Sequence, residues 1–407
     1  MTAVFWLSLF LFLYPFFLYP PILAALARLL PQRHRPPAPD EWPTVSLVVP
    51  VRNGEGLIQE KIRNSLALDY PPERLEILVA SDGSADETVS RARALTGERV
   101  RLLEYREHEG KNATLNKAVP ETSGEILLLS DADARLERDA LQRLVSWFRD
   151  PTVGGVCGRK VLPSGESGFG ESQATYNAYE ERLKKGESRL ESITTNEGKI
   201  HALRRALFQE IPPATADDLF NLLAVVRQGR AFVYEDAARA FIPPGSLDPA
   251  HEIKRRKRIV SGSLRALWAN RELFHPFRHG RYAWMLLSHK VGRRLAPVFM
   301  ILATLSSLYL AAVGALPIYR LFFWGMSALV LAALLVHGRM LPGRARAGSL
   351  GKLLAVPYYF CLGNWGTLLG VADFLKGSPS ALKWETRKER LAVMDPVETS
   401  CARNKGG

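Results

Sequence analysis

The sequence predicts an α/β domain built on a parallel, doubly wound sheet, with apolar helices at both ends of the 407-residue chain. Two observations predict this fold class. Short apolar runs alternate with segments of helical spacing between residues 44 and 130, which is typical of strands joined by helices in a parallel sheet. Long apolar stretches near both ends have the length that crosses a membrane.

The first apolar stretch predicts a membrane helix. Val4 to Ala27 carries no charge and would extend about 36 Å as a helix, which exceeds a hydrocarbon core of about 30 Å. Pro15, Pro20 and Pro21 predict that this helix is kinked or tilted. A secretory signal peptide is the alternative, because residues 25–27 resemble a cleavage site. The length of the stretch and the absence of basic residues before it favour a membrane helix.

After a proline-rich linker over residues 31–43, strands and helices are expected to alternate. The apolar patterns place strands at 45–50, 75–80, 100–105 and 125–130, and helices at 60–68, 87–95 and 113–119. In sheets of this kind, ligands bind beyond the carboxyl ends of the strands. Polar residues that directly follow these strands are therefore candidates for a site.

Asp131 and Asp133 follow the apolar strand at 125–130. Residues two apart in an extended segment share a face, so the two carboxylates should point the same way. At a separation of about 4 Å they would repel by roughly 4 kcal/mol at an effective dielectric constant of about 20. Water around an exposed turn would relieve this repulsion. A buried pair calls for a cation instead, and Mg²⁺ or Mn²⁺ with a phosphate is the expected occupant because these ions prefer oxygen ligands.

Asp82 follows the strand at 75–80 and should lie at the same edge of the sheet as the acidic pair. It could brace a turn, while Ser84 or Asp86 caps the helix that follows. It could also accept a hydrogen bond from the ring N–H of a uracil, which a carboxylate does more strongly than a neutral side chain. Its position beside a second acidic cluster favours the nucleotide role.

Two further segments carry candidate groups. Lys111 follows Gly110 in a loop that lacks the spacing of a Walker motif, so its ammonium group either neutralises a diphosphate or lies in solvent. Asp217 and Asp218 precede an apolar helix. They either stabilise the N-terminus of that helix through its dipole or include a general base that takes a proton from a hydroxyl group.

The remainder of the chain is expected to contact the membrane. The basic run from residue 254 predicts an amphipathic helix at the membrane surface, whose arginines bind headgroups or a diphosphate. Apolar segments at 295–315 and 318–336 are expected to span, and 350–375, interrupted by proline and glycine, spans or re-enters. These patterns divide the chain into a membrane helix at 1–30, the linker at 31–43, a catalytic domain at 44–250, interfacial helices at 251–294, membrane segments at 295–376 and a basic tail at 377–407.

Charge gives the expected orientation. Basic residues flank the apolar segments mainly on one side, which predicts a multi-pass protein of the inner or plasma membrane with residues 30–294 in the cytoplasm and the N-terminus outside. The basic tail at 383–390 conflicts with four simple crossings and favours a re-entrant last segment. The net charge of +13 fits anionic headgroups better than nucleic acid. Three cysteines without CxxC spacing indicate a reducing compartment and no zinc site.

Taken in order, these segments closely resemble the membrane-integrated glycosyltransferases of family 2, the clan of cellulose, chitin and hyaluronan synthases and of many bacterial exopolysaccharide and glycolipid enzymes. The resemblance extends over about residues 44–262 and implies a GT-A fold, a Rossmann-like domain. It implies the following donor-binding residues: Pro50, Val51 and Asn53 in the opening nucleotide strand, Asp82 at the uridine, Lys111 and Asn116 in a lysine-containing loop, and Asp131 and Asp133 at the metal and diphosphate.

On the acceptor side, the resemblance implies an acceptor loop at Asn196 and Gly198. Asp217 and Asp218 fall where the family carries its TED motif, whose Thr-Glu is replaced here by Ala216-Asp217, and Asp218 matches the catalytic base. Two arginines, Arg255 and Arg258, partly match the family's Gln-x-x-Arg-Trp motif and are expected to add positive charge at the diphosphate. An isoleucine replaces the tryptophan that helps processive enzymes to hold the acceptor sugar, which argues against long-chain synthesis.

The implied function is inverting transfer of a sugar from a UDP-linked donor to a hydroxyl group of a polysaccharide or lipid-linked glycan, with Mg²⁺ or Mn²⁺ as cofactor. Membrane lipids and other subunits of a synthase complex are the implied partners, and nucleic acid is not. A nucleotidyltransferase on the same kind of sheet is one alternative, and it would release pyrophosphate instead of UDP. The other is a non-catalytic subunit that binds nucleotide sugar within a synthase complex, for which the presence of Asp218 is unfavourable.

Overall fold

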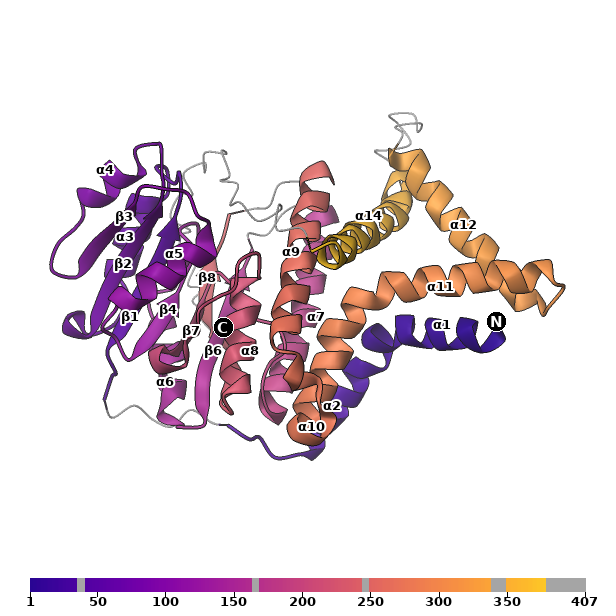
Figure 1. Ribbon diagram of the computed structural model, residues 1–407, viewed down its shortest axis with the longest axis horizontal. Coiled ribbons are helices and arrows are strands. Elements are labelled where there is room, and N and C mark those ends of the chain that lie inside the picture. The colour runs from indigo at the N-terminus through magenta and orange to yellow at the C-terminus, as the bar shows by residue number, and fades with distance from the viewer. Residues whose placement is uncertain (35–40, 163–167, 244–248, 338–348, 378–407) are drawn as a thin grey trace, which may run out of the picture.

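The computed structural model describes residues 1–34, 41–162, 168–243, 249–337 and 349–377. Within these ranges eight strands form one sheet in the order β3-β2-β1-β4-β7-β6-β8-β5 (Figure 1). The strands are β1 Val45–Val51, β2 Leu75–Asp82, β3 Val100–Tyr105, β4 Ile126–Leu129, β5 Arg135–Leu136, β6 Val153–Val161, β7 His201–Arg204 and β8 Ala231–Phe241.

The first half of the sheet has the predicted parallel pairing. Strand β1 pairs in parallel with β2 and β4, and β2 pairs in parallel with β3. Every residue of β1 is buried, because helices cover both faces of the sheet. The four predicted strands agree with the observed ones to within two residues at each end.

The second half of the sheet departs from the prediction of a wholly parallel sheet. Strand β7 runs antiparallel to both of its neighbours, β4 and β6, and β5 runs antiparallel to β8. The end of α7 (Gly168–Leu190) lies beside the start of β8, and the loop that follows brings the chain back to the end of β4, where His201 pairs with Leu129 and β7 begins. A buried apolar run of four residues carries no periodic signal that would distinguish the two directions.

Helices cover the sheet in two layers. One face packs against α5 (Lys111–Ala118), α7 and α8 (Asp217–Arg227), and the other against α3 (Ile58–Leu66), α4 (Thr88–Arg93) and α6 (Ala140–Ser146). Both layers are apolar because each helix presents one hydrophobic face to the sheet. The observed α3, α4 and α5 correspond to the three predicted helices, each shifted by one to two residues.

Apolar helices extend to one side of the sheet domain (Figure 1). The helical segment Pro276–Ala312 is kinked at Gly280, whose φ is +45°, and contains α10 (Pro276–Met285), a π-helical segment Leu286–Val291 and α11 (Gly292–Ala312). This segment and Pro317–Val336, within α12 (Pro317–His337), are long and apolar enough to cross a membrane. Helices α1 (Thr2–Phe17) and α2 (Tyr19–Leu29) make a third candidate if the pair is one span.

The predicted kink in the N-terminal segment is confirmed. Helices α1 and α2 are inclined by 47° to each other, and the break falls at Leu18, directly before the two prolines in the first turn of α2. Proline cannot donate the backbone hydrogen bond that would continue the preceding helix, which explains the position of the break. Helix α2 also contacts the sheet domain, because the Tyr19 hydroxyl donates a 2.6 Å hydrogen bond to Glu187 of α7.

The last helix, α14 (Ser349–Leu375), is one helix without an internal turn and packs along α9 (Pro249–Ala269). Asp373 accepts a 2.7 Å hydrogen bond from Ser261 and pairs with Lys257 at 2.9 Å, and Gly370 allows close contact with Val260. The basic segment of α9 therefore contacts a neighbouring helix through part of its surface. Its contact with the membrane surface stays a prediction, and the basic tail lies outside the described residues.

Candidate active site

The acidic groups predicted to converge do so around two lysines. Lys111, the first residue of α5, places its Nζ atom 2.7 Å from Asp131 Oδ1 and 2.8 Å from Asp217 Oδ2. Lys199, in the loop before β7, lies 3.0 Å from Asp131 and 2.6 Å from Asp133. Carboxylates from two distant segments thus meet in one charge network.

The network controls the charge of its central carboxylate. Burial would raise the pKa of Asp131, but the ammonium groups of Lys111 and Lys199 outweigh burial and hold the pKa of Asp131 well below its usual range. Asp131 is therefore ionised at neutral pH, and its negative charge is available to a cation or to the two lysines.

A second buried lysine supports the turn that carries Asp131 and Asp133. Lys61 of α3 donates hydrogen bonds of 2.6 Å to Ser130 Oγ and 2.7 Å to the Ala134 carbonyl, so it holds both ends of the turn. Burial lowers the pKa of Lys61 to about 7, and the two aspartates oppose that effect. Lys61 could not be recognised from the sequence, because a single lysine on an amphipathic helix is most often a solvated residue.

Asp218 lies in the first turn of α8 and faces the acceptor-side segment. Its main-chain carbonyl accepts a 3.0 Å hydrogen bond from Asn196 Nδ2, and a Cβ atom at Gly198 would lie 3.8 Å from both Asp218 and Lys111. Burial and the neighbouring Asp217 raise the pKa of Asp218 to about 6, although Lys290 and Lys111 oppose this shift. A carboxylate with a pKa near neutrality is suited to accept a proton.

The loop that contains Asn196 and Gly198 is fixed on several sides. Glu197 pairs with Lys184 of α7 at 2.7 Å and with Lys160 of β6 at 3.2 Å. Asn196 Oδ1 is buried and accepts no hydrogen bond from any residue that the structure describes. This oxygen is therefore available to a hydroxyl group of a substrate.

The same loop is connected to the apolar helices through Glu187 of α7. This carboxylate accepts hydrogen bonds from the Thr194 backbone N–H at 2.8 Å, from Tyr19 of α2 and from His289 of the π-helical segment, the last at 2.6 Å. Glu187 is fully buried, so its charge is compensated only by these contacts. The position of the loop thus depends on α2, α7 and the π-helical segment together.

Asp82 lies at the predicted edge of the sheet, but its oxygens already have partners. It is 1% exposed and accepts hydrogen bonds from the backbone N–H groups of Glu109 and Gly110, at 2.9 and 3.0 Å, and from His108 Nδ1 at 2.8 Å. Gly110 has a φ of +96°, which allows the chain to turn into α5. Asp82 therefore fixes the loop that positions Lys111, and its contact with a nucleotide base stays a prediction.

The opening strand places its three candidate residues in different environments. Pro50 and Val51 are buried within β1, and Val51 packs in the core. Asn53 follows the strand with a φ of +47° and accepts a 2.8 Å hydrogen bond from the Ala85 backbone N–H. Asn53 thus joins the loops after β1 and β2, at the edge where the resemblance places the nucleotide.

The two arginines Arg255 and Arg258 lie on α9, away from the lysine network. Arg255 is exposed and pairs with Glu252 at 2.8 Å. Neither arginine contacts the aspartates of the site, within the part of the chain that the structure describes. Their expected role at a diphosphate stays a prediction.

Asn116 has a structural role in this arrangement. Its side-chain amide donates to and accepts from the backbone of Ile211, at 3.0 and 2.9 Å. One turn earlier, Asn112 donates hydrogen bonds to the carbonyls of Pro212 and Thr215, at 3.0 and 2.9 Å. The two amides therefore hold the segment that precedes Asp217. This role of Asn112 and Asn116 could not be recognised from the sequence.

Replacing Asn116 with alanine should lower the free energy of unfolding by about 2 kcal/mol, because two backbone groups of Ile211 lose their partner. It should also lower sugar transfer, because the segment before α8 is no longer held. The matched control is Asn64→Ala, which removes the same pair of backbone hydrogen bonds at Leu136, at 2.8 Å each. Denaturant unfolding and transfer assays on both variants make the comparison. If Asn116→Ala and Asn64→Ala were equally stable and lost sugar transfer to the same extent, the result would contradict the role assigned to Asn116.

The comparisons with known proteins agree with this geometry. Residues 46–212 match the family model described as glycosyl transferase family 2. This segment is a glycosyltransferase family 2 domain. It contains the aspartates of the lysine network that follow β4, the Asp82 loop and the acceptor-side loop, and the match ends five residues before Asp217.

Relatives and structures resemble the chain to different extents. A beta-monoglucosyldiacylglycerol synthase of Synechocystis sp. is 31% identical over 147 residues, which cover 35% of this chain and 29% of that protein. Cellulose synthase 1 of Komagataeibacter xylinus is 35% identical over 120 residues, which cover 29% of this chain and 8% of that protein. The matched part is thus less than a third of each relative.

A solved structure confirms the fold class over nearly the whole chain. The mannosyltransferase PcManGT from Pyrobaculum calidifontis, in complex with GDP-Man and Mn²⁺, superimposes with a TM-score of 0.65 at 23% identity, covering 92% of this chain and 98% of that one. At this identity the likeness establishes the fold alone. The chain therefore has the expected GT-A-like architecture, with long apolar helices outside residues 46–212.

The donor set of the family 2 domain fits a divalent cation. Asp131 and Asp133 present two carboxylates to one point, which the ammonium group of Lys199 contacts in this structure. No cluster of three or more acidic, histidine or cysteine ligands occurs among the described residues. Mg²⁺ typically keeps waters and phosphate oxygens as ligands beside one or two carboxylates, so the pair is sufficient.

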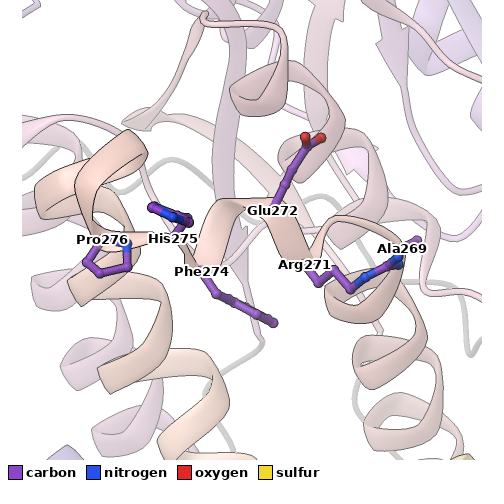
Figure 2. Close-up of a pocket in the computed structure, with 6 residues that line it drawn as sticks. All are labelled: Ala269, Arg271, Glu272, Phe274, His275 and Pro276. Carbon is purple, nitrogen blue, oxygen red and sulfur yellow. The ribbon is translucent and has the colours of Figure 1, made fainter.

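A separate surface hollow lies at the junction of α9 and α10. Figure 2 shows its lining, which consists of Ala269, Arg271, Glu272, Phe274, His275 and Pro276. Glu272 pairs with Arg227 at 3.4 Å, and none of the lining residues belongs to the lysine network. The hollow is therefore a weaker candidate for the site of chemistry than the network at the strand ends.

Proposed function

We propose that the protein is a membrane-bound, metal-dependent glycosyltransferase that moves a sugar from a UDP-linked donor to a hydroxyl group with inversion. The acceptor is a polysaccharide or a lipid-linked glycan. The observation that supports this most is the contact of Lys111 with both acidic segments, since it joins the carboxylates suited to a cation with the segment that carries the base. The matched family and the GT-A-like fold support the same activity.

On the donor side, Asp131 and Asp133 would hold Mg²⁺ or Mn²⁺, which neutralises charge on a departing diphosphate when bound. Lys111 and Lys199 add positive charge at the same place. Lys111 lies at the N-terminus of α5, where the helix dipole also favours an anion. Asp82 holds the loop before α5 and thereby fixes the position of Lys111.

On the acceptor side, Asp218 would take the proton of the attacking hydroxyl group, and Asn196 Oδ1 would accept a second hydrogen bond from the acceptor. The number of free carboxylates supports inversion. Asp217 and Asp131 are paired with Lys111, which leaves Asp218 as the unpaired carboxylate of the described network. One base without a second carboxylate nucleophile supports a single displacement.

The apolar helices support a location in the inner or plasma membrane, with the family 2 domain in the cytoplasm. Two or three helices are long enough to span, and the basic residues beside them favour the cytoplasmic side. An acceptor in the membrane would reach Asp218 from the side on which α9, α11 and α14 pack. Other subunits of a synthase complex are compatible partners for the same helices.

The test is a screen of nucleotide sugars with full-length protein in detergent or nanodiscs, with Mn²⁺ or Mg²⁺. We expect release of UDP, accompanied by a glycosylated lipid or glycan in mass spectrometry. Release of pyrophosphate would support the nucleotidyltransferase alternative. Binding of nucleotide sugar without turnover on any lipid or glycan acceptor would support the non-catalytic alternative.

A further inference from the structure

The helix Pro276–Ala312 carries two cations into the acceptor side of the site. Its π-helical segment, Leu286–Val291, includes Lys290, whose Nζ atom lies 3.5 Å from Thr195 Oγ1. Thr195 precedes Asn196, and Lys290 is close enough to Asp218 to oppose the rise in the pKa of Asp218. Single π-helical turns are rare in helices and occur frequently at functional sites. This turn aims Lys290 at the loop and the base.

Arg294 follows Lys290 by one turn on the same helix. Its NH2 atom lies 3.4 Å from Ser263 Oγ of α9, and its Nε atom is buried without a hydrogen-bond partner. Arg256 of α9 is close enough to Arg294 to affect it electrostatically, but its guanidinium group is paired with Glu252 at 3.2 Å. Arg294 therefore keeps donors that no described side chain satisfies in full.

Among the acidic groups nearby, Asp218 acts on Lys290 electrostatically without forming an ion pair with it, and the others are paired elsewhere. Glu180 accepts from Arg293 and lies 3.3 Å from His289, and Asp217 pairs with Lys111. Within the described ranges, no carboxylate lies within 4.0 Å of Lys290 or Arg294 in an ion pair. Two like charges one turn apart on a helix repel each other, and burial of an unpaired charge adds to that cost. A bound anion would offset both costs.

We propose that Lys290 and Arg294 form an anion site on the acceptor side and take the phosphate group of a lipid-anchored acceptor. This inference rests on the proposed function and names a chemical class for its acceptor. The lipid anchor follows from position, because the helix beyond Arg294 continues as an apolar segment whose Ile301, Leu305 and Leu308 side chains are exposed. A phosphate at this depth lies where charged headgroups meet the hydrocarbon region.

The test measures binding, so it does not depend on turnover. Full-length protein in nanodiscs is saturated with UDP and Mn²⁺, or with whichever nucleoside diphosphate the donor screen identifies, which fills the donor site. Affinities are then measured for dioctanoyl phosphatidate, dioctanoylglycerol and inorganic phosphate. We expect wild-type protein to bind dioctanoyl phosphatidate at least tenfold more tightly than either other probe. Equal affinity for phosphatidate and free phosphate would overturn the lipid anchor, and equal affinity for phosphatidate and the neutral lipid would overturn the anion site.

Variants distinguish this site from the donor site. Lys290→Gln combined with Arg294→Gln should remove the preference for phosphatidate, and Lys290→Gln alone should weaken it at least threefold. Arg278→Gln, which removes an exposed cation from the part of the segment Pro276–Ala312 before the kink at Gly280, should leave the preference unchanged. The affinity for the nucleoside diphosphate should stay within twofold in every variant, which also shows that each variant is folded. A preference that is undiminished in Lys290→Gln, or a loss of nucleotide affinity in that folded variant, would overturn the assignment. Failure of the proposed function would appear in the donor screen and not in these affinities.

Discussion

Asp218→Asn should lower sugar transfer by about three orders of magnitude while nucleotide binding stays near that of the wild type. A positioned general base contributes about 10²–10⁴-fold to rate, and an amide cannot accept the proton. Asparagine has the shape of aspartate and can keep the 2.7 Å hydrogen bond from the Leu219 backbone N–H, so the start of α8 should stay intact. Transfer assays and nucleotide titrations with Mn²⁺ measure the two quantities separately.

The pH dependence provides an internal check on the same residue. Asp218 must be ionised to act as a base, and its pKa is raised to about 6, so kcat/KM of the wild type should rise as the pH increases through about 6. The control is Asp236→Asn, which makes the same substitution at a surface carboxylate that pairs with Lys185 and is 43% exposed. Loss of nucleotide binding together with transfer in Asp218→Asn would contradict the role of base. A kcat/KM of the wild type that does not change between pH 5 and 7 would also contradict the role of Asp218 as base.

Asp133→Ala should remove the dependence of nucleotide binding on Mn²⁺ and lower transfer at least a hundredfold. Two carboxylates meet at the point where the cation is expected, and the substitution leaves Asp131 as the one remaining carboxylate of this pair. Asp131 is already shared between Lys111 and Lys199, so it cannot compensate. Titration of UDP into the protein with and without Mn²⁺, by calorimetry, measures the effect. A gain in affinity from Mn²⁺ that persists in the variant would exclude Asp133 as a ligand.

Lys199→Ala is the informative counterpart, because the Lys199 ammonium group contacts both carboxylates in this structure. A cation at the same point must displace that group, so the variant should bind Mn²⁺ more tightly than the wild type when nucleotide is absent. Glu109→Ala, which removes a surface carboxylate paired with Lys117, should leave Mn²⁺ binding unchanged. Weaker binding of Mn²⁺ in Lys199→Ala would contradict the competition between the lysine and the metal.

The sequence predicts the strands that carry the site because each is a short apolar run followed by a polar residue. Asp131 and Asp133 after β4, and Asp82 after β2, could be placed at one edge from the parallel order alone. The convergence of Asp217 with them could be inferred only from the family resemblance, since a helix N-terminus explains the same residues equally well. The structure adds the observation that Lys111 joins the two segments.

The remaining features depend on contacts between distant segments, which the spacing of apolar residues along the sequence does not indicate. Lys199 follows the acceptor loop and returns to the turn after β4, and Lys61 reaches that turn from α3. Asn116 looks like a ligand by its position after Lys111, but the structure commits its amide to Ile211. In each case the sequence shows a polar residue, and only the tertiary fold decides whether its partner is protein or substrate.

The carboxylate of Glu187 joins Tyr19, Thr194 and His289, so the loop that contains Asn196 and Gly198 is held partly by the apolar helices. Excision of residues 44–250 as a soluble fragment would remove two donors of this carboxylate and expose it to water. Such a fragment should still hydrolyse its donor slowly but should not transfer the sugar to an acceptor. In the intact enzyme, the choice of detergent or the thickness of the bilayer should change the rate of transfer.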